Sequence, residues 1–198
     1  MTAPSAFQPD PDTRTPVVII GAGPAGLRAA EILSAAGLPV EVHDRMPSPA
    51  RKFLMAGRGG LNLTHSEPVE RFSDRYGAAS PTVMDWLGRF GPDNMTRWSE
   101  ALGQPTFVGS SGRVFPNSMK ASPLLRAWLQ RLRERGVVLH SGSNWVGFEG
   151  GAPVFERAGE RQTRPARALV VATGGASWPR LGSDGRGLDL LSGLGVVS

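Results

Sequence analysis

Three glycines near the amino end of the chain have the spacing of a turn that binds a dinucleotide. Gly21, Gly23 and Gly26 directly follow the apolar residues 17–20 and open a stretch with the apolar periodicity of a helix. In such a motif the first glycine permits a tight turn, the second lets a pyrophosphate approach the backbone, and the third lets the helix pack closely on the strand. The N–H groups and the dipole of the helix favour a phosphate at its first turn. The spacing therefore predicts a strand, a turn and a helix that hold a dinucleotide pyrophosphate.

A carboxylate in the expected place strengthens this prediction. Residues 38–43 have the pattern of a second buried strand, and Asp44 at its end can accept hydrogen bonds from a ribose. An acid here would repel a 2′-phosphate, which argues against NADP, although the neighbouring Arg45 would partly neutralise such a phosphate. From these residues alone, NAD and FAD both fit.

A second glycine-rich segment, residues 51–64, combines positive charge with bare backbone. The glycines at positions 57, 59 and 60 would expose amide groups to a flat ligand or an anion, and the pair at positions 51 and 52 is basic. The polar side chains at positions 62 and 64 suit the edge of a heterocycle. A flexible surface loop is the alternative interpretation. The candidate cofactor-binding residues of this segment are Arg51, Lys52, Gly59, Gly60 and Asn62.

A third candidate segment follows the apolar residues 166–172, which are typical of a buried strand. The turn leaving this strand contains Thr173, Gly174 and Gly175 after Ala172. Because ligands of open α/β sheets bind beyond the carboxyl ends of the strands, these residues are candidates for a second backbone contact with the cofactor. The alternative is an ordinary glycine turn.

Composition narrows the class of protein. The chain has 198 residues, 40% of them hydrophobic and 20% charged, as is typical of a globular domain. It contains no cysteine, which excludes disulfides, a thiol nucleophile and the disulfide-reductase type of flavoenzyme. It also has no apolar run long enough to span a membrane. Residues 1–14 lack the apolar centre of a secretory signal, so we expect a disordered polar tail and a cytoplasmic location.

The formal net charge of +5 raises the question of nucleic-acid binding. The arginines are scattered, and the densest group (Arg126, Arg131, Arg133 and Arg135) falls on a predicted helix with an apolar stripe. We therefore expect these arginines to form the solvated face of the helix, with an anion-binding or nucleic-acid role as the alternative. We predict no nucleic-acid partner.

The order of predicted elements indicates an α/β fold with a central parallel sheet. Residues 45–80 are predicted to form a long functional loop. Helices are expected from residue 80 to 90, from 92 to 102, and from about 122, with Ser122 and Pro123 as its cap, to 136. A hairpin is expected for residues 106–108 and 113–115, and short strands for residues 137–140, 145–148 and 153–156, which would give a small β-meander.

Five segments together resemble the BaiN/YhiN-like bacterial flavoproteins, which are FAD-dependent oxidoreductases, some of them named as aminoacetone-oxidase-type enzymes. The segments are GAGPAG at residues 21–26, the acid at position 44, RKFLMAGRGGLNLT at 51–64, GRVFPNSMKAS at 112–122 and VVATGGASWPRLGSDGRG at 170–187. The similarity extends from about residue 15 to the last residue. It implies a Rossmann-like FAD-binding domain.

The resemblance also implies which residues contact FAD. The glycine motif would hold the pyrophosphate and Asp44, next to Arg45, the adenosine ribose, while the backbone of Val146 would touch adenine. Arg51 and Lys52 match the family's basic pair, and residues 172–175 match its second cofactor contact. The residues of the glycine motif are Gly21, Ala22, Gly23, Pro24, Ala25 and Gly26, and the flavin-side residues are Gly59, Gly60 and Asn62.

Two departures from the family pattern affect the functional prediction. Many members have GGGRCN where this chain has residues 57–62, so Gly60 and Leu61 replace an arginine and a cysteine. This removes any mechanism that uses the cysteine and leaves the substrate open. Family members are also considerably longer and return to the FAD fold after a substrate domain. We therefore expect residues 15–198 to be the amino-terminal part of an FAD-binding domain, incomplete at its carboxyl end, with a new strand starting at residues 196–198. Alone, this part should bind FAD weakly and be inactive.

The expected activity is hydride transfer from a small-molecule substrate to the flavin. Two alternatives are an RNA-modifying flavoprotein and a non-catalytic dinucleotide-binding fragment. We identify no catalytic base and no metal site, and the oligomeric state stays open. His65 is expected to be structural and His43 and His140 to be packing residues, whereas Trp178 is a candidate for lining a substrate cavity.

Overall fold

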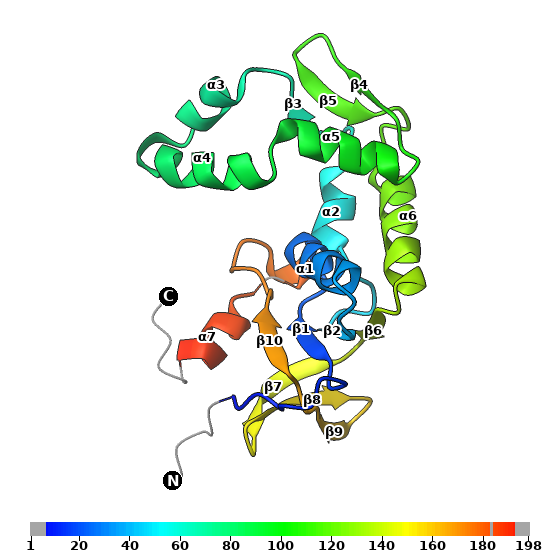
Figure 1. The fold of residues 1–198 in the computed structure, drawn as a ribbon, viewed down its shortest axis with the longest axis vertical. Helices are drawn as coiled ribbons and strands as arrows, with labels where there is room; N and C mark the ends of the chain where they lie inside the picture. Colours follow the sequence, from blue (N-terminus) through cyan, green and yellow to red (C-terminus); the bar gives the residue numbers. More distant parts are fainter. Residues whose placement is uncertain (1–6, 183, 193–198) are drawn as a thin grey trace. The chain divides into compact units, whose positions relative to one another are not determined.

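The computed structural model describes residues 7–182 and 184–192, and the chain divides into two compact units (Figure 1). One unit comprises residues 1–52 and 131–198, and the other comprises residues 53–130. The boundaries fall inside two helices, α2 (Arg51–Ala56) and α6 (Ala121–Glu134).

The first unit is built on a parallel sheet with the strand order β10-β1-β2-β6 (Figure 1). Its strands are β1 (Val17–Ile20), β2 (Val40–Asp44), β6 (Val138–Ser141) and β10 (Ala168–Val171). Helix α1 (Pro24–Ala35) connects β1 to β2. All four strands run in the same direction, so their carboxyl ends meet at one edge. This arrangement confirms the predicted Rossmann-like α/β fold.

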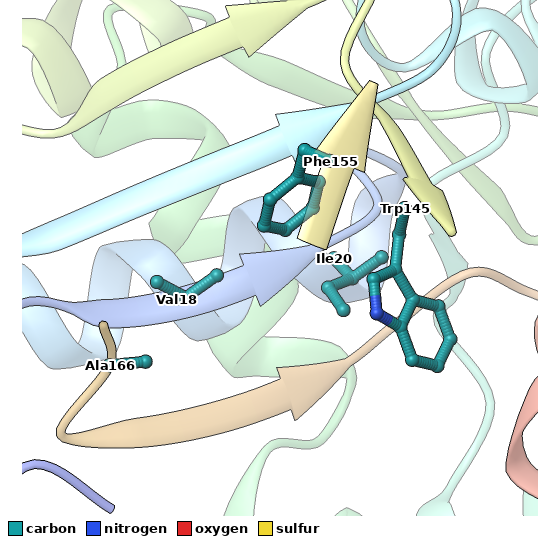
Figure 2. Close-up of a cluster of buried hydrophobic side chains, with 5 residues drawn as sticks. All are labelled: Val18, Ile20, Trp145, Phe155 and Ala166. Carbon is teal, nitrogen blue, oxygen red and sulfur yellow. The ribbon is translucent and has the colours of Figure 1, made fainter. Parts of the chain in front are cut away.

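Alternate residues of β1 face different layers. The side chain of Ile19 points toward α1, where its Cγ2 lies near Gly26. Val18 and Ile20 point the other way and pack on Trp145 and Phe155 of an antiparallel meander, as Figure 2 shows. The meander consists of β7 (Asn144–Glu149), β8 (Ala152–Arg157) and β9 (Glu160–Thr163). The small β-meander was predicted, but its expected first strand at residues 137–140 belongs to the parallel sheet as β6, and β9 was not predicted.

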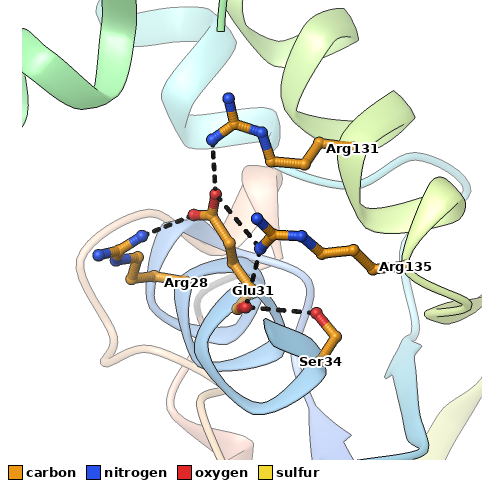
Figure 3. A network of polar contacts seen from close by, with 5 residues as sticks. All are labelled: Arg28, Glu31, Ser34, Arg131 and Arg135. Atoms are coloured by element: carbon orange, nitrogen blue, oxygen red, sulfur yellow. Dashed lines mark hydrogen bonds and ion pairs between the residues drawn. The ribbon is translucent and has the colours of Figure 1, made fainter. Parts of the chain in front are cut away.

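A buried carboxylate connects α1 to the carboxyl-terminal part of α6. The side chain of Glu31 is only 4% exposed and forms ion pairs with Arg28 at 2.7 Å and with Arg131 at 3.1 Å. Arg135 donates to the backbone oxygen of Glu31 at 3.1 Å (Figure 3). The prediction of a solvated arginine face is therefore wrong for Arg131, whose side chain is 21% exposed and neutralises an acid inside the fold. Arg126, Arg133 and Arg135 are exposed, as predicted, although Arg135 also contacts Glu31.

The second unit contains short helices around a three-stranded antiparallel sheet with the order β3-β5-β4. The strands are β3 (Thr64–His65), β4 (Thr106–Val108) and β5 (Arg113–Pro116). The helices are α3 (Val69–Asp74), α4 (Ser80–Arg89) and α5 (Pro92–Ala101), with the 3-10 turn η1 (Gly77–Ala79) before α4. Trp98 of α5 packs edge-on against Trp128 of α6, with ring centroids 4.9 Å apart.

The prediction of a long loop at residues 45–80 is wrong. This stretch contains α2, β3, α3 and η1. Each of these elements has six residues or fewer, so none is long enough to display a clear hydrophobic period. Helix α6 begins at Ala121, so Ser122 and Pro123 lie inside its first turn and do not precede it.

The two ends of the described chain belong to the first unit. The expected polar tail has backbone hydrogen bonds from Gln8 N to Gly151 O at 2.7 Å and from Asp10 N to Ala166 O at 2.9 Å. After β10 come the 3-10 turn η2 (Pro179–Leu181) and α7 (Arg186–Ser192). The strand expected at residues 196–198 lies outside the described residues. Within the described part of the chain, no helix has the length and apolar character required to cross a bilayer.

Candidate functional site

The glycine turn between β1 and α1 is sterically fixed at two of its three glycines. Gly21 has a φ of +106°, and a Cβ there would collide with the backbone carbonyl of Ala172. A Cβ at Gly26 would collide with the carbonyl oxygen of Gly21. At Gly23, in contrast, a Cβ would meet nothing within 4 Å. The first and third glycines therefore serve the packing of the turn, and the second keeps open the space in front of the helix.

The amino end of α1 has the features of an anion site. Gly23 is its N-cap and Pro24 its first residue, and no side chain caps the helix. Its first turn contains no acidic residue that would neutralise the positive end of the helix dipole. Backbone N–H groups at this end can therefore interact with an external phosphate.

Asp44 ties the end of β2 to the glycine turn. Its Oδ2 accepts a hydrogen bond from the N–H of Ala22 at 2.7 Å, and its Oδ1 accepts one from the N–H of Met46 at 2.8 Å. A carboxylate has about four acceptor positions, so both oxygens can still accept from a sugar hydroxyl. Asp44 thus stabilises the glycine turn and can still bind a ligand through the same carboxylate.

Two hollows adjoin at the carboxyl edge of the parallel sheet. The first has a volume of about 380 Å³ and extends from β2 toward β7 and α7. The second, about 180 Å³, lies in front of the glycine turn and the start of α2. Gly21, Asp44, Thr173 and Gly182 line both hollows, so the two are direct neighbours, and together they are called the cleft.

Most of the predicted cofactor-binding residues of the first unit line this cleft. The first hollow is lined by Gly21, Asp44, Arg45, Val146 and Thr173, and the second by Gly21, Gly23, Pro24, Ala25, Asp44, Arg51, Lys52, Ala172, Thr173 and Gly174. The predicted residues Ala22, Gly26 and Gly175 do not line it. Ala22 is buried under the turn, where its N–H holds Asp44.

Positive charge lies at both hollows. The Nε of Arg51 is buried and has no hydrogen-bond partner among the described residues. Next to it, Lys52 Nζ donates to Ser177 Oγ at 2.9 Å. At the other hollow, Arg45 pairs with Asp184 at 2.9 Å. Burial opposes ionisation of Asp184, but bonds from the backbone of Arg186 and the side chain of Arg45 hold its pKa below the usual value.

The flavin-side candidates belong to the second unit. Gly60 has a φ of +109°, so its backbone conformation by itself accounts for this glycine, whereas a Cβ there would meet only the flexible end of Met119. The Asn62 amide, oriented to satisfy both of its polar atoms, donates to Thr64 O at 2.8 Å. Gly59 has open space at its Cβ position. Contact of these residues with a heterocycle stays a prediction.

Three other residues named from the sequence have definite surroundings. His65 Nε2 lies 2.9 Å from Ser111 O and its Nδ1 accepts from the N–H of Glu67, which agrees with a structural role. Leu61, at the family's cysteine position, is 3% exposed and belongs to the core of the second unit. Trp178 is 44% exposed; a role in a substrate cavity stays a prediction.

Sequence reasoning missed part of the cleft wall. Trp145 both packs in the core and lines the first hollow. Asp184 and Arg186 also line this hollow. Their segment GSDGRG contains the signal of a polar turn, but nothing in its spacing shows that it lies beside β2.

A parallel sheet with a glycine turn and a cleft at its carboxyl edge defines a Rossmann-type nucleotide-binding fold. The family model described as the HI0933-like protein Rossmann domain matches residues 15–197, and the chain belongs to this family. This confirms the resemblance found in the sequence.

Curated relatives match nearly the whole chain. The 3-dehydro-bile acid delta(4,6)-reductase of Clostridium scindens is 28% identical over 179 residues, which cover 89% of this chain and 43% of the relative. The ribosomal RNA dihydrouridine synthase of Haemophilus influenzae is 26% identical and is matched over 90% of this chain and 45% of its own length. The chain thus spans less than half the length of these relatives.

Solved structures share the fold. The 3-ketosteroid-delta4-(5alpha)-dehydrogenase from Rhodococcus jostii RHA1 superimposes with a TM-score of 0.69 at 17% identity, over 99% of this chain and 57% of that one. A flavocytochrome c3 fumarate reductase in an open conformation gives a TM-score of 0.54 at 18% identity, over 87% of this chain and 34% of that one. At these identities the likeness establishes the fold alone.

Proposed function

We propose that this chain is the FAD-binding portion of a flavin-dependent oxidoreductase. The observation that carries the proposal is the cleft, whose two neighbouring hollows are lined by Asp44, the uncapped start of α1 and the basic pair Arg51 and Lys52. The first two features are the sugar acceptor and the pyrophosphate site of a dinucleotide, and the positive charge of the third suits its phosphates. The family membership supports the proposal.

The residues of the cleft fit the parts of FAD. Asp44 would accept hydrogen bonds from the adenosine ribose, and Val146 and Trp145 would form the wall beside adenine. The first turn of α1 would donate N–H groups to the pyrophosphate, while the unpartnered Nε of Arg51 offers it a charged donor. When bound, FAD supplies the capacity to exchange a hydride with a small organic substrate. The chain positions it and shields its phosphate charge.

For the substrate we propose a molecule with a carbon–carbon double bond conjugated to a carbonyl group. The two kinds of relative are named for a delta(4,6)-reductase of a 3-dehydro-bile acid and for the formation of dihydrouridine. Both names describe the addition of a hydride and a proton across such a bond, although one substrate is a steroid and the other a base in RNA. Because the two substrates differ so much in size, what they share is the conjugated double bond and not the molecule that carries it.

Cofactor binding tests the first proposal directly. The purified chain should bind FAD in a fluorescence titration, weakly as expected for part of an FAD-binding domain, and the complex should show the flavin absorption at about 450 nm, which is a property of the cofactor. FMN, which lacks the adenosine that the first hollow would hold, should bind more weakly than FAD. NADP should bind more weakly than NAD because of Asp44. A chain that binds NAD but neither FAD nor FMN would refute the proposal.

The substrate class is tested with the reduced cofactor. The complete oxidoreductase, loaded with FAD and reduced chemically under argon, should be reoxidised faster by a 3-oxo-4-ene steroid than by the saturated 3-oxo steroid. The saturated compound is the matched control because it differs only in the double bond. Equal reoxidation rates would contradict the proposed class while leaving FAD binding intact.

A further inference from the structure

Three side chains with metal-binding atoms converge on the face of the parallel sheet that carries the meander. Glu41 and His43 are two residues apart on β2, so their side chains share one face of the strand. His140 on the neighbouring strand β6 lies opposite His43 in the register of the sheet. One ligand atom from each of the three residues lies within 4.8 Å of the others.

The spacing in this cluster fits metal ligands better than hydrogen-bond partners. Glu41 Oε2 lies 3.4 Å from His43 Nε2 and 3.4 Å from His140 Nε2. Both distances are longer than a normal N–H···O bond of about 2.9 Å. The His140 Nε2 is buried and makes no hydrogen bond within the described residues. Ligand atoms around a tetrahedral zinc ion, with bonds of about 2.0–2.2 Å, are about 3.3–3.6 Å apart.

The surroundings hold one histidine firmly and leave the other room to adjust. The ring of His43 is 2% exposed, stacks on Phe155 with centroids 3.9 Å apart, and its Nδ1 lies 2.8 Å from Ser143 Oγ. Such a contact at Nδ1 orients the ring and leaves Nε2 as the ligand atom. The His140 ring lies nearly parallel to it, with an interplanar angle of 21°. The Nε2 lone pairs of both histidines must point at the same ion. The ring of His140 would therefore have to turn toward the ion, and it can do so because its Nε2 holds no hydrogen bond among the described residues.

The cluster also has an entry path. Glu41 lines an open hollow of about 480 Å³ whose wall includes Asp10 and Asp12. Arg164 lies on the same wall, and its positive charge opposes a cation.

We propose that Glu41, His43 and His140 form a Zn²⁺ site, with the fourth position left to water. Two imidazole nitrogens and one carboxylate are a known zinc ligand set, and imidazole is favoured by this metal. The ion would link β2 to β6 immediately before Asp44, and so would hold the edge of the cleft. This site revises the expectation of no metal site, and it does not depend on the proposed flavin function.

The composition of the chain makes the experiment selective. The chain has three histidines and no cysteine, so His65 is the one histidine outside the cluster. The full chain is treated with a chelator, dialysed and titrated with ZnCl₂ in a calorimeter at neutral pH, and its thermal unfolding is followed with and without Zn²⁺. We expect one equivalent to bind and the melting temperature to rise, because a ligand of the native state stabilises it by mass action.

Four variants decide which residues bind the ion. His140→Gln and Glu41→Gln should each weaken Zn²⁺ binding at least about tenfold. The control His65→Gln should leave it unchanged. Arg164→Gln should tighten it severalfold, since a nearby positive charge is removed. Circular dichroism of each variant shows whether it is folded.

Three outcomes would overturn the proposal. The first is wild-type protein with no Zn²⁺ binding by calorimetry and no change in melting temperature. The second is binding that a folded His140→Gln variant retains at full affinity. The third is binding that disappears in His65→Gln. Any of these would reduce the cluster to a pair of packed histidines beside an acid.

Discussion

Gly23 and Gly26 belong to one sequence motif but do different work, and two alanine variants separate the roles. Space is open at Gly23, whose φ of −76° and ψ of 179° suit any residue. We expect Gly23→Ala to fold with nearly unchanged stability but to bind FAD at least about tenfold more weakly, because the methyl group enters the pyrophosphate position. Fluorescence titration with FAD and urea unfolding measure the two effects.

Gly26→Ala is the matched comparison. Its methyl group would collide with the carbonyl oxygen of Gly21, so the turn or the helix must shift. We expect a loss of unfolding free energy of about 1–3 kcal/mol, as for an overpacked core site. If Gly23→Ala instead lost stability and kept FAD affinity, the space in front of α1 would not be the pyrophosphate position.

At the residue scale, the part of the site that is contiguous in sequence could be predicted. The glycine turn, Asp44 and the basic pair at the start of α2 are close together in the sequence, and apart from Ala22 and Gly26 they line the cleft. Trp145 and Asp184 could not be assigned, because their place depends on contacts between distant segments. One such contact is the pair between Arg45 and Asp184, which are 139 positions apart.

At the scale of elements, Glu31 and its arginines hold α1 to the end of α6. We expect Glu31→Gln to cost about 2–3 kcal/mol in unfolding free energy, because it leaves guanidinium groups without their anion. The estimate is below the range for fully buried pairs, since Arg131 is 21% and Arg28 37% exposed. Urea denaturation at neutral pH measures this loss.

Arg133→Ala is the control for the contacts between Glu31 and its arginines. Arg133 lies on the same helix but is exposed, so its removal should change the unfolding free energy by no more than about 0.5 kcal/mol. If Glu31→Gln and Arg133→Ala changed the unfolding free energy equally, the ion pairs of Glu31 would contribute no more to stability than an exposed charge does.

The elements that could be predicted are those with a long or strongly apolar pattern. The buried residues of β1, for example, form a continuous apolar run that identifies a parallel strand. The two-residue strand β3 carries no such pattern, since it exists through pairing with β5. The buried Glu31 was likewise invisible in sequence, because its partners Arg131 and Arg135 lie about a hundred positions away.

At the scale of the whole molecule, many arginines form ion pairs with acids of the chain itself. Such arginines occur in both units. They include Arg14, Arg28, Arg45, Arg75, Arg89, Arg131, Arg135, Arg161 and Arg186. A basic side chain that already neutralises an acid contributes less to the release of counterions from a phosphate backbone. We therefore expect these arginines to add little to the affinity for nucleic acid.

The pairing of the arginines gives a prediction for RNA binding. The relatives that are named as ribosomal RNA dihydrouridine synthases make it worth testing. We expect a single-stranded RNA oligonucleotide to bind this chain weakly at low salt, and with a dissociation constant above about 100 µM at 150 mM KCl, the weak end of non-specific binding. Fluorescence anisotropy over a series of salt concentrations gives both the affinity and the number of phosphates neutralised. A shallow salt dependence with micromolar affinity at 150 mM KCl would contradict the prediction, because binding would then rest on base contacts and not on scattered charge. That result would favour an RNA base over a steroid as the substrate with the conjugated double bond.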